Sequence, residues 1–216
     1  MIEQHITVER TARYWLSGAP TEATRSVWFL LHGYGQLARE FLSEFADVGD
    51  ASRLLVAPEG LSRYYRRGAT GREVGATWMT REDRLNEIRD YIDYLDKVYA
   101  EVRKGVDGGE LTAGVLGFSQ GVATACRWAA MGRSHLDRLI LWAGQVPPDL
   151  ELTEYGDRLS ALSPVLVLGD GDQYAGETEL AAEQVRLKTA GVRHRVVRFS
   201  GGHRIDLPTL RPLLGV

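Results

Sequence analysis

The sequence of 216 residues has little of what marks secreted scaffolds and membrane proteins. Cys126 is its only cysteine, which excludes a disulfide within the chain and favours a reducing compartment. The longest apolar runs, such as 27–31 and 164–168, have about five residues, whereas a membrane-spanning helix needs roughly 20. Residues 1–10 contain no apolar segment of the kind found in signal peptides. We therefore expect a cytoplasmic protein without stable membrane insertion.

Excess positive charge is also missing. The chain has 26 basic and 29 acidic residues, a formal net charge of −3. Binding to nucleic acid depends on clustered basic residues, so no nucleic-acid partner is expected. The hydrophobic content of 44% and the charged content of 25% are ordinary for a globular protein. This length and composition predict one domain spanning 1–216.

Short apolar runs alternate with segments of helical periodicity along the chain. Buried strands are predicted at 27–33, 53–60, 111–117, 137–144, 164–172 and 193–203. Helices are predicted for about 23 residues from Thr80, at 121–132, at about 176–190 and from about Pro208. The segment 4–16 has strand character and fits an antiparallel position at a sheet edge. This alternation predicts an α/β fold, a mostly parallel twisted sheet with helices on both faces.

A candidate nucleophile lies where the strand 111–117 runs into the following helix. The segment 117–121 reads Gly-Phe-Ser-Gln-Gly, the Gly-x-Ser-x-Gly pattern in a strand–turn–helix setting. The glycines permit a turn so sharp that Ser119 stands clear of the sheet at a helix N-terminus. Ser119 is therefore predicted to be the nucleophile; the alternative is a serine that only caps the helix.

A serine nucleophile needs a base and an acid. His203 follows the last predicted strand and two glycines, which suits a base that folds back over Ser119. His32 is interpreted as structural. The acid should follow the strand 164–168, where Asp170 and Asp172 are both candidates, and we favour Asp172 because it lies deeper in the turn.

The chemistry also needs donors for an oxyanion. One is predicted to be the backbone N–H of Gln120, directly after the nucleophile. The other should come from the glycine-containing turn at 31–35, where the N–H of Tyr34 is the candidate.

Together these motifs resemble the α/β-hydrolase fold and, more narrowly, the phospholipase/carboxylesterase family that includes the acyl-protein thioesterases. The resemblance rests on LHGYG at 31–35, GFSQG at 117–121, GDGD at 169–172 and GGH at 201–203. It implies an esterase or thioesterase that needs no cofactor, with Ser119, Asp172 and His203 as its triad. The connection of about 20 residues before the strand 164–168 is too short for a cap domain, where many α/β-hydrolases carry one.

Residues 61–78 are the most individual segment. They are rich in arginine, and Arg66 and Arg67 are candidate contacts for an anionic group on the substrate, because guanidinium groups match carboxylates and phosphates. The alternative is a solvated loop. Trp78 is a further candidate substrate contact, by its match to a Trp-Phe pair that the resembled family carries beside its pocket.

The sequence thus predicts a serine esterase for small-molecule esters, and the resemblance implies that their acyl chains are short to medium. A thioesterase or lysophospholipase with the same triad is the first alternative, and a non-catalytic ligand-binding α/β-hydrolase is the second. No metal is expected, since no cluster of His, Cys and carboxylates has ligand spacing.

Overall fold

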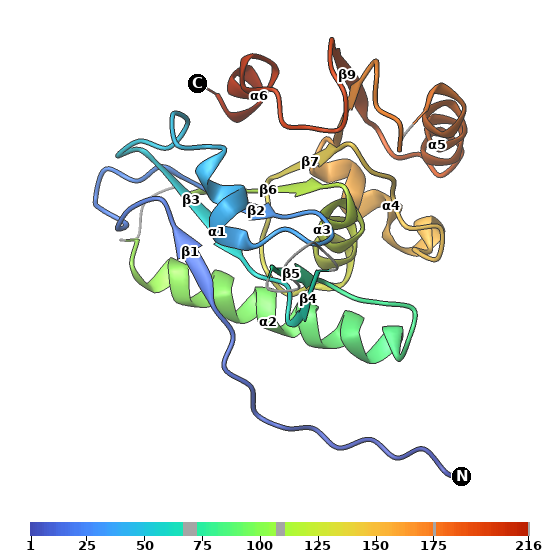
Figure 1. Cartoon of the computed structure of the whole chain (residues 1–216). Helices are drawn as coiled ribbons and strands as arrows, with labels where there is room; N and C mark the ends of the chain where they lie inside the picture. The colour runs from blue at the N-terminus through green and yellow to red at the C-terminus, as the bar shows by residue number, and fades with distance from the viewer. Residues whose placement is uncertain (67–72, 107–110, 175, 216) are drawn as a thin grey trace.

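A seven-stranded sheet organises the protein, whose computed structural model describes residues 1–66, 73–106, 111–174 and 176–215 (Figure 1). The strand order is β1-β3-β2-β6-β7-β8-β9, and all neighbours pair in parallel except β1 and β3. The strands are β1 (Tyr14–Leu16), β2 (Ser26–Leu31), β3 (Arg53–Pro58), β6 (Thr112–Phe118), β7 (Arg138–Trp142), β8 (Val165–Gly169) and β9 (Arg195–Phe199).

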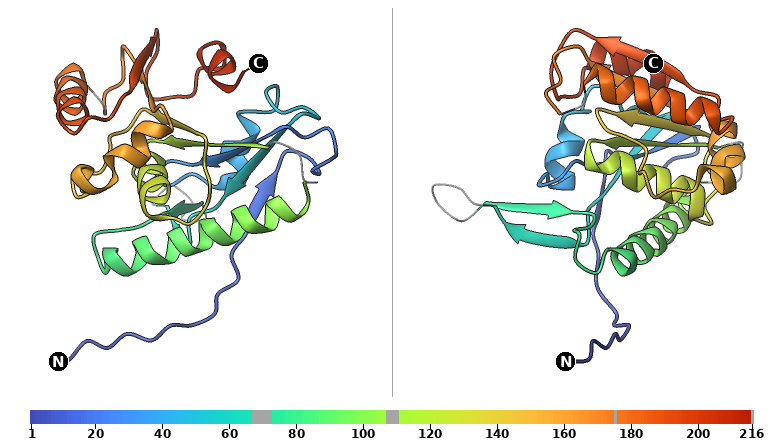
Figure 2. Two further views of the ribbon diagram at one scale, coloured as in Figure 1. Left: turned by 180° about the vertical axis from the view of Figure 1, so that it is seen from behind. Right: turned by 90° about the vertical axis from the view of Figure 1, so that its right-hand side faces the viewer.

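Helices cover both faces of this sheet, as the alternation of the sequence predicted (Figure 2). They are α1 (Ala38–Ser43), α2 (Arg84–Lys104), α3 (Gln120–Met131), α4 (Leu152–Ala161), α5 (Glu177–Thr189) and α6 (Leu207–Leu214). Alternate residues of β2 enter two separate cores: Val27 and Phe29 pack with α2 to α5, and Trp28 packs with α1 and α6. This two-sided burial explains why the strands read as unbroken apolar runs.

A second, antiparallel sheet of two strands was not predicted. The strands β4 (Ser62–Tyr65) and β5 (Val74–Thr77) form a hairpin that projects from the body (Figure 2). The charged residues of this segment obscure the alternation of a strand, so the sequence favours a loop here. The segment is anchored instead, since Ser62 pairs with Thr77 and Tyr65 with Val74.

Two predicted boundaries were wrong. Helix α2 begins at Arg84 and not at Thr80, because Asp83 adopts a left-handed conformation (φ 47°, ψ 33°) that a right-handed helix cannot continue through. Of the segment 4–16, only β1 pairs with the sheet, and the residues before it are extended and exposed (Figure 1).

The connection between β7 and β8 holds α4 and, within the described residues, no cap. Among all the residues that the structure describes, no helix is both long and apolar enough to cross a membrane.

Candidate functional site

Ser119 occupies a strained turn between β6 and α3. Its backbone angles are φ 54° and ψ −116°, a conformation that residues other than glycine rarely adopt. The Ser119 N–H donates to the Trp142 carbonyl at 2.9 Å, which ties the turn to β7. The surrounding sheet thus supports a serine in the geometry expected of a nucleophile elbow.

Glycines make this turn possible because main chain fills the space around it. A Cβ at Gly121 would lie 2.1 Å from the Leu31 carbonyl oxygen, and one at Gly117 would lie 2.3 Å from the Gly121 carbonyl oxygen. A Cβ at Gly33 would lie 3.2 Å from the Ser119 Cβ. The turn after β2 therefore runs directly beside Ser119.

Two backbone amides near Ser119 are the candidate oxyanion donors. The Tyr34 N–H follows Gly33 and has no hydrogen-bond partner within the described ranges. Gln120 is the first residue of α3, so its N–H is one of those without a partner inside the helix. The Gly35 N–H donates to the Ala76 carbonyl at 2.8 Å, which fastens this turn to β5.

His203 and Asp172 lie together on the loops after β9 and β8. The His203 Nδ1 is 2.8 Å from the Asp172 Oδ2, and the other carboxylate oxygen accepts the Tyr174 N–H at 2.8 Å. The Asp172 side chain is completely buried. The His203 ring lies 4.9 Å from the ring of Phe118, the residue before Ser119. The structure therefore brings His203 to the elbow with a carboxylate behind it.

Asp170, the other candidate acid, lies in a different environment. Its carboxylate is exposed and is 3.4 Å from Arg198, which also pairs with Glu177. The turn between the two acids is closed by a hydrogen bond from the Asp172 N–H to the Gly169 carbonyl at 3.0 Å. This turn directs Asp172 inward, so the geometry favours Asp172 as the partner of His203.

His32 is buried and joins backbone segments. Its Nδ1 lies 2.8 Å from the Gly33 carbonyl oxygen, so it carries the proton, and its Nε2 accepts the Gly60 N–H at 3.0 Å. Burial lowers the pKa of His32. A neutral imidazole with both nitrogens engaged fits the structural interpretation.

Trp78 needs a correction. Its side chain is 1% exposed, its indole N–H donates to the His32 carbonyl at 2.8 Å, and its ring stacks on the His32 imidazole. The expectation that Trp78 contacts substrate does not fit this burial. The side chain supports the turn after β2 from within the core.

The side chain of Gln120 has a structural role that the sequence does not reveal. Its Oε1 accepts the Trp78 N–H at 3.2 Å, and its Nε2 donates to the Met79 carbonyl at 2.9 Å. Gln120 thus fastens the segment after β5 to the nucleophile turn. Only the three-dimensional closeness of residues about 40 positions apart reveals this.

The arginines of the hairpin differ in position. Arg63 pairs with Glu59, 3.4 Å away, whereas Arg66 is 3.4 Å from Glu73 across the hairpin. Arg67 lies outside the described residues.

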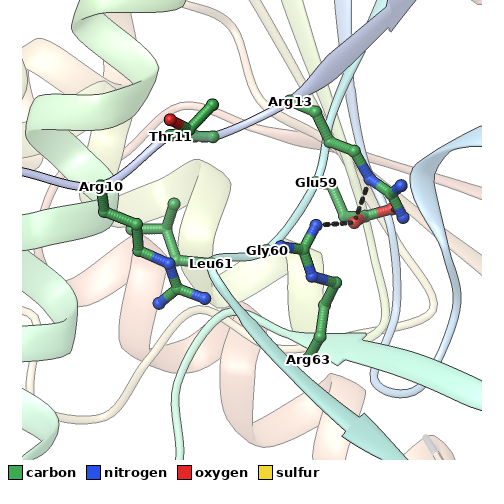
Figure 3. A pocket seen from close by; sticks show the side chains of 8 residues that line it. Arg10, Thr11, Arg13, Glu59, Gly60, Leu61 and Arg63 are labelled. Atoms are coloured by element: carbon green, nitrogen blue, oxygen red, sulfur yellow. Dashed lines mark hydrogen bonds and ion pairs between the residues drawn. The ribbon is translucent and has the colours of Figure 1, made fainter.

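A small pocket at the base of the hairpin is lined by Arg10, Arg13 and Arg63, and the guanidinium groups of Arg13 and Arg63 contact the buried Glu59 (Figure 3). Arg13 Nε is 2.7 Å from the Glu59 carboxylate, which also accepts the Ala38 N–H. The carboxylate therefore ties β1, the hairpin and α1 together, and we interpret the pocket as structural.

Glu3, His5 and Asp83 are close enough to share a metal ion. All three are exposed, and His5 already lies within ion-pairing distance of both carboxylates. This cluster does not include any residue of the Ser119 site.

Comparison with solved structures finds proteins that share this fold. The chain resembles the crystal structures of Zea mays acyl-protein thioesterase 2 (15% identity, TM-score 0.69, covering 95% of this chain and 97% of that one), esterase PE8 (21%, 0.66, 95% and 97%) and Bacillus cereus carboxylesterase (18%, 0.67, 94% and 92%). No curated protein matches.

The expected α/β-hydrolase fold, a mostly parallel sheet with helices on both faces, is thereby confirmed. The sequence model that matches, over residues 28–213, is the one described as Serine hydrolase (FSH1). This match spans most of the chain and includes the elbow, both candidate acids and His203. The chain belongs to the Serine hydrolase (FSH1) family.

Proposed function

We propose that the protein is a carboxylesterase that cleaves small-molecule esters through an acyl-enzyme on Ser119. The observation that carries this proposal is the strained Ser119 turn together with the buried Asp172–His203 pair beside it. A non-catalytic binding protein has no use for a serine in a strained conformation beside an oriented imidazole.

In this mechanism His203 takes the proton of the Ser119 hydroxyl as that oxygen attacks the ester carbonyl. The N–H groups of Tyr34 and Gln120 donate to the oxyanion that forms. His203 then gives the proton to the leaving alcohol. Water, deprotonated by the same imidazole, releases the acid and restores Ser119.

Asp172 holds the His203 proton on Nδ1, which leaves Nε2 free to act as the base. It also stabilises the imidazolium that forms when Ser119 loses its proton. Because its second oxygen is engaged by the Tyr174 N–H, the carboxylate is fixed in orientation.

The proposed substrates have short to medium acyl chains, which the resemblance to the phospholipase/carboxylesterase family implies. Thioester cleavage would use the same residues, and the acyl-protein thioesterase among the structural relatives makes it the second candidate.

Labelling with a fluorophosphonate probe tests the proposal. We expect the wild-type chain to label and Ser119→Ala to remain unlabelled, and p-nitrophenyl acetate and butyrate to be cleaved far faster than the palmitate. An acyl-CoA of matched length decides between ester and thioester. Equal labelling of the wild type and Ser119→Ala would refute the nucleophile.

A further inference from the structure

The side chain of Arg66 packs against the turn that supplies the proposed Tyr34 donor. A Cβ built at Gly35 would lie 3.7 Å from the Arg66 Cδ, and one built at Gly75 would lie 3.1 Å from its Cγ. The Arg66 N–H donates to the Glu73 carbonyl at 2.7 Å, so the hairpin fixes the backbone from which this side chain extends.

The alternation of β4 separates Arg66 from Arg63. Tyr64 lies on the side of Arg66, since its hydroxyl oxygen would be 3.2 Å from a Cβ at Gly35 and its ring is 5.3 Å from that of Tyr34. Burial raises the pKa of the Tyr64 phenol to about 12, so this neighbour of Arg66 stays neutral. Arg63 faces the other way, toward Glu59 (Figure 3).

The guanidinium of Arg66 has unused hydrogen-bonding capacity. Its Nη2 is only 3.4 Å from the carboxylate of Glu73, while its Nε is buried and has no partner among the residues that the structure describes, so the Nη groups are the ones that a substrate can reach. The two side chains are 40% and 64% exposed, and ion pairs this exposed are weak because water screens them. A planar guanidinium can bind a carboxylate through two parallel hydrogen bonds, so a substrate carboxylate can replace Glu73.

Ser119 and Arg66 contact opposite ends of one short turn. Gly33 approaches the Ser119 Cβ and Gly35 approaches Arg66. The α carbons of residues two apart are separated by at most about 7.6 Å. A carboxylate only a few bonds from the ester carbonyl is therefore within reach of the guanidinium.

We propose that Arg66 determines substrate class, and that the preferred ester carries a free carboxylate a few bonds from the bond that is cleaved. This inference rests on the esterase function proposed above. The carboxylate can belong to the acyl part, as in a half-ester of a dicarboxylic acid, or to the leaving alcohol.

Four esters test the proposal: p-nitrophenyl hemiglutarate against p-nitrophenyl pentanoate, and 4-carboxyphenyl butyrate against phenyl butyrate. Each pair has one acidic and one neutral member, and the two pairs distinguish an acyl carboxylate from a leaving-group carboxylate. We expect Arg66→Ala to lower kcat/KM for one acidic ester by roughly tenfold, mainly through KM, because a charged hydrogen-bond partner is lost. Its neutral counterpart should change by less than about twofold.

Three further variants separate charge recognition from a structural effect. Arg66→Lys should retain part of the preference, since it keeps the charge but loses the bidentate geometry. Glu73→Gln should raise kcat/KM for the acidic ester, because the competing carboxylate is gone. Arg63→Ala removes the same charge from the same hairpin on the side of Glu59, and it should leave the preference unchanged.

The inference is overturned if Arg66→Ala affects acidic and neutral esters equally, if Arg63→Ala acts like Arg66→Ala, or if the wild type prefers neither acidic ester. In each of these cases hydrolysis of the neutral esters and labelling of Ser119 would still support the esterase. A wild-type chain that cleaves none of the four esters and takes no fluorophosphonate would refute the esterase and the inference together.

Discussion

Replacing Asp172 with asparagine tests the arrangement around His203 with almost no change of shape. The side-chain oxygen of the new amide can still accept the Tyr174 N–H, which Asp172 accepts at 2.8 Å. The amide nitrogen then faces His203 Nδ1 in place of the carboxylate oxygen that is 2.8 Å away. Two N–H donors cannot bond one another, so Nδ1 must become an acceptor and the proton moves to Nε2. The imidazole then has no free nitrogen for the Ser119 proton.

The size of the effect follows from these two contacts. In a serine protease triad the corresponding change lowers kcat by about 10⁴, or roughly 5.4 kcal/mol of barrier. The buried Asp172 carboxylate has the same relation to His203, and we expect a loss of about 10³ to 10⁴ in kcat. Stability should change little, by less than about 1 kcal/mol, because no buried donor loses its partner.

The assay is hydrolysis of p-nitrophenyl butyrate, with urea unfolding of each variant alongside. Asp170→Asn is the matched control, since Asp170 is in the same turn but is exposed and pairs with Arg198. It should keep kcat within about twofold. The reasoning fails if Asp172→Asn retains more than about a tenth of the activity while folded, or if Asp170→Asn is equally damaging.

Three further changes act on the support of the site. Gln120→Ala leaves the Trp78 N–H without its acceptor, which should cost about 1–3 kcal/mol in urea unfolding while kcat stays within about tenfold, because the oxyanion donor is backbone. Gly121→Ala puts a Cβ 2.1 Å from the Leu31 carbonyl oxygen and should lower the free energy of unfolding by more than about 3 kcal/mol, or abolish soluble expression. Since burial lowers the pKa of His32, the unfolded chain binds a proton that the folded chain excludes, so stability should fall by up to about 1.4 kcal/mol per pH unit below about pH 6.5. His32→Gln should flatten that part of the pH profile.

Each of these variants has a control at a position without the contact. Gln4→Ala changes an exposed residue, Gly18→Ala would place its Cβ at least 4 Å from any neighbour, and His135→Gln replaces an exposed histidine. None of these control variants should reproduce the effect of the variant that it is compared with. Equal destabilisation by Gly18→Ala and Gly121→Ala, or an unchanged acid slope in His32→Gln, would contradict the structural reasoning.

The elements that the sequence predicted best are the buried strands and the turn at Ser119. The strands are covered on both faces, so their apolar runs are continuous. The glycines around Ser119 stand where main chain leaves no space for a Cβ, so their spacing marks the turn. The sequence also indicated that Asp170 and Asp172 share one turn. The choice between them depends on how that turn is closed at Gly169, which no local pattern specifies.

What escaped prediction depends on contacts between distant residues. Helix α2 begins late because Asp83 is left-handed, and the residues before it are held by the contact of the Thr80 N–H with Glu87, seven positions further along the chain. Trp78 has the size and aromaticity of a substrate platform, but its indole N–H has a buried partner at His32. The hairpin β4–β5 is held by Gly35 and Ala76, which no local pattern connects.

The close packing of main chain around Ser119 has a consequence for how the protein tolerates change. Gly117 and Gly121 lie against backbone carbonyl groups, and Gly33 lies against Phe118 and Ser119 of the elbow. The position of the serine therefore depends on the register of the strands that carry these residues. Side chains elsewhere can be exchanged as long as that register holds. A designer seeking new substrates should therefore vary the hairpin and the loop after β8 and leave the strand ends untouched.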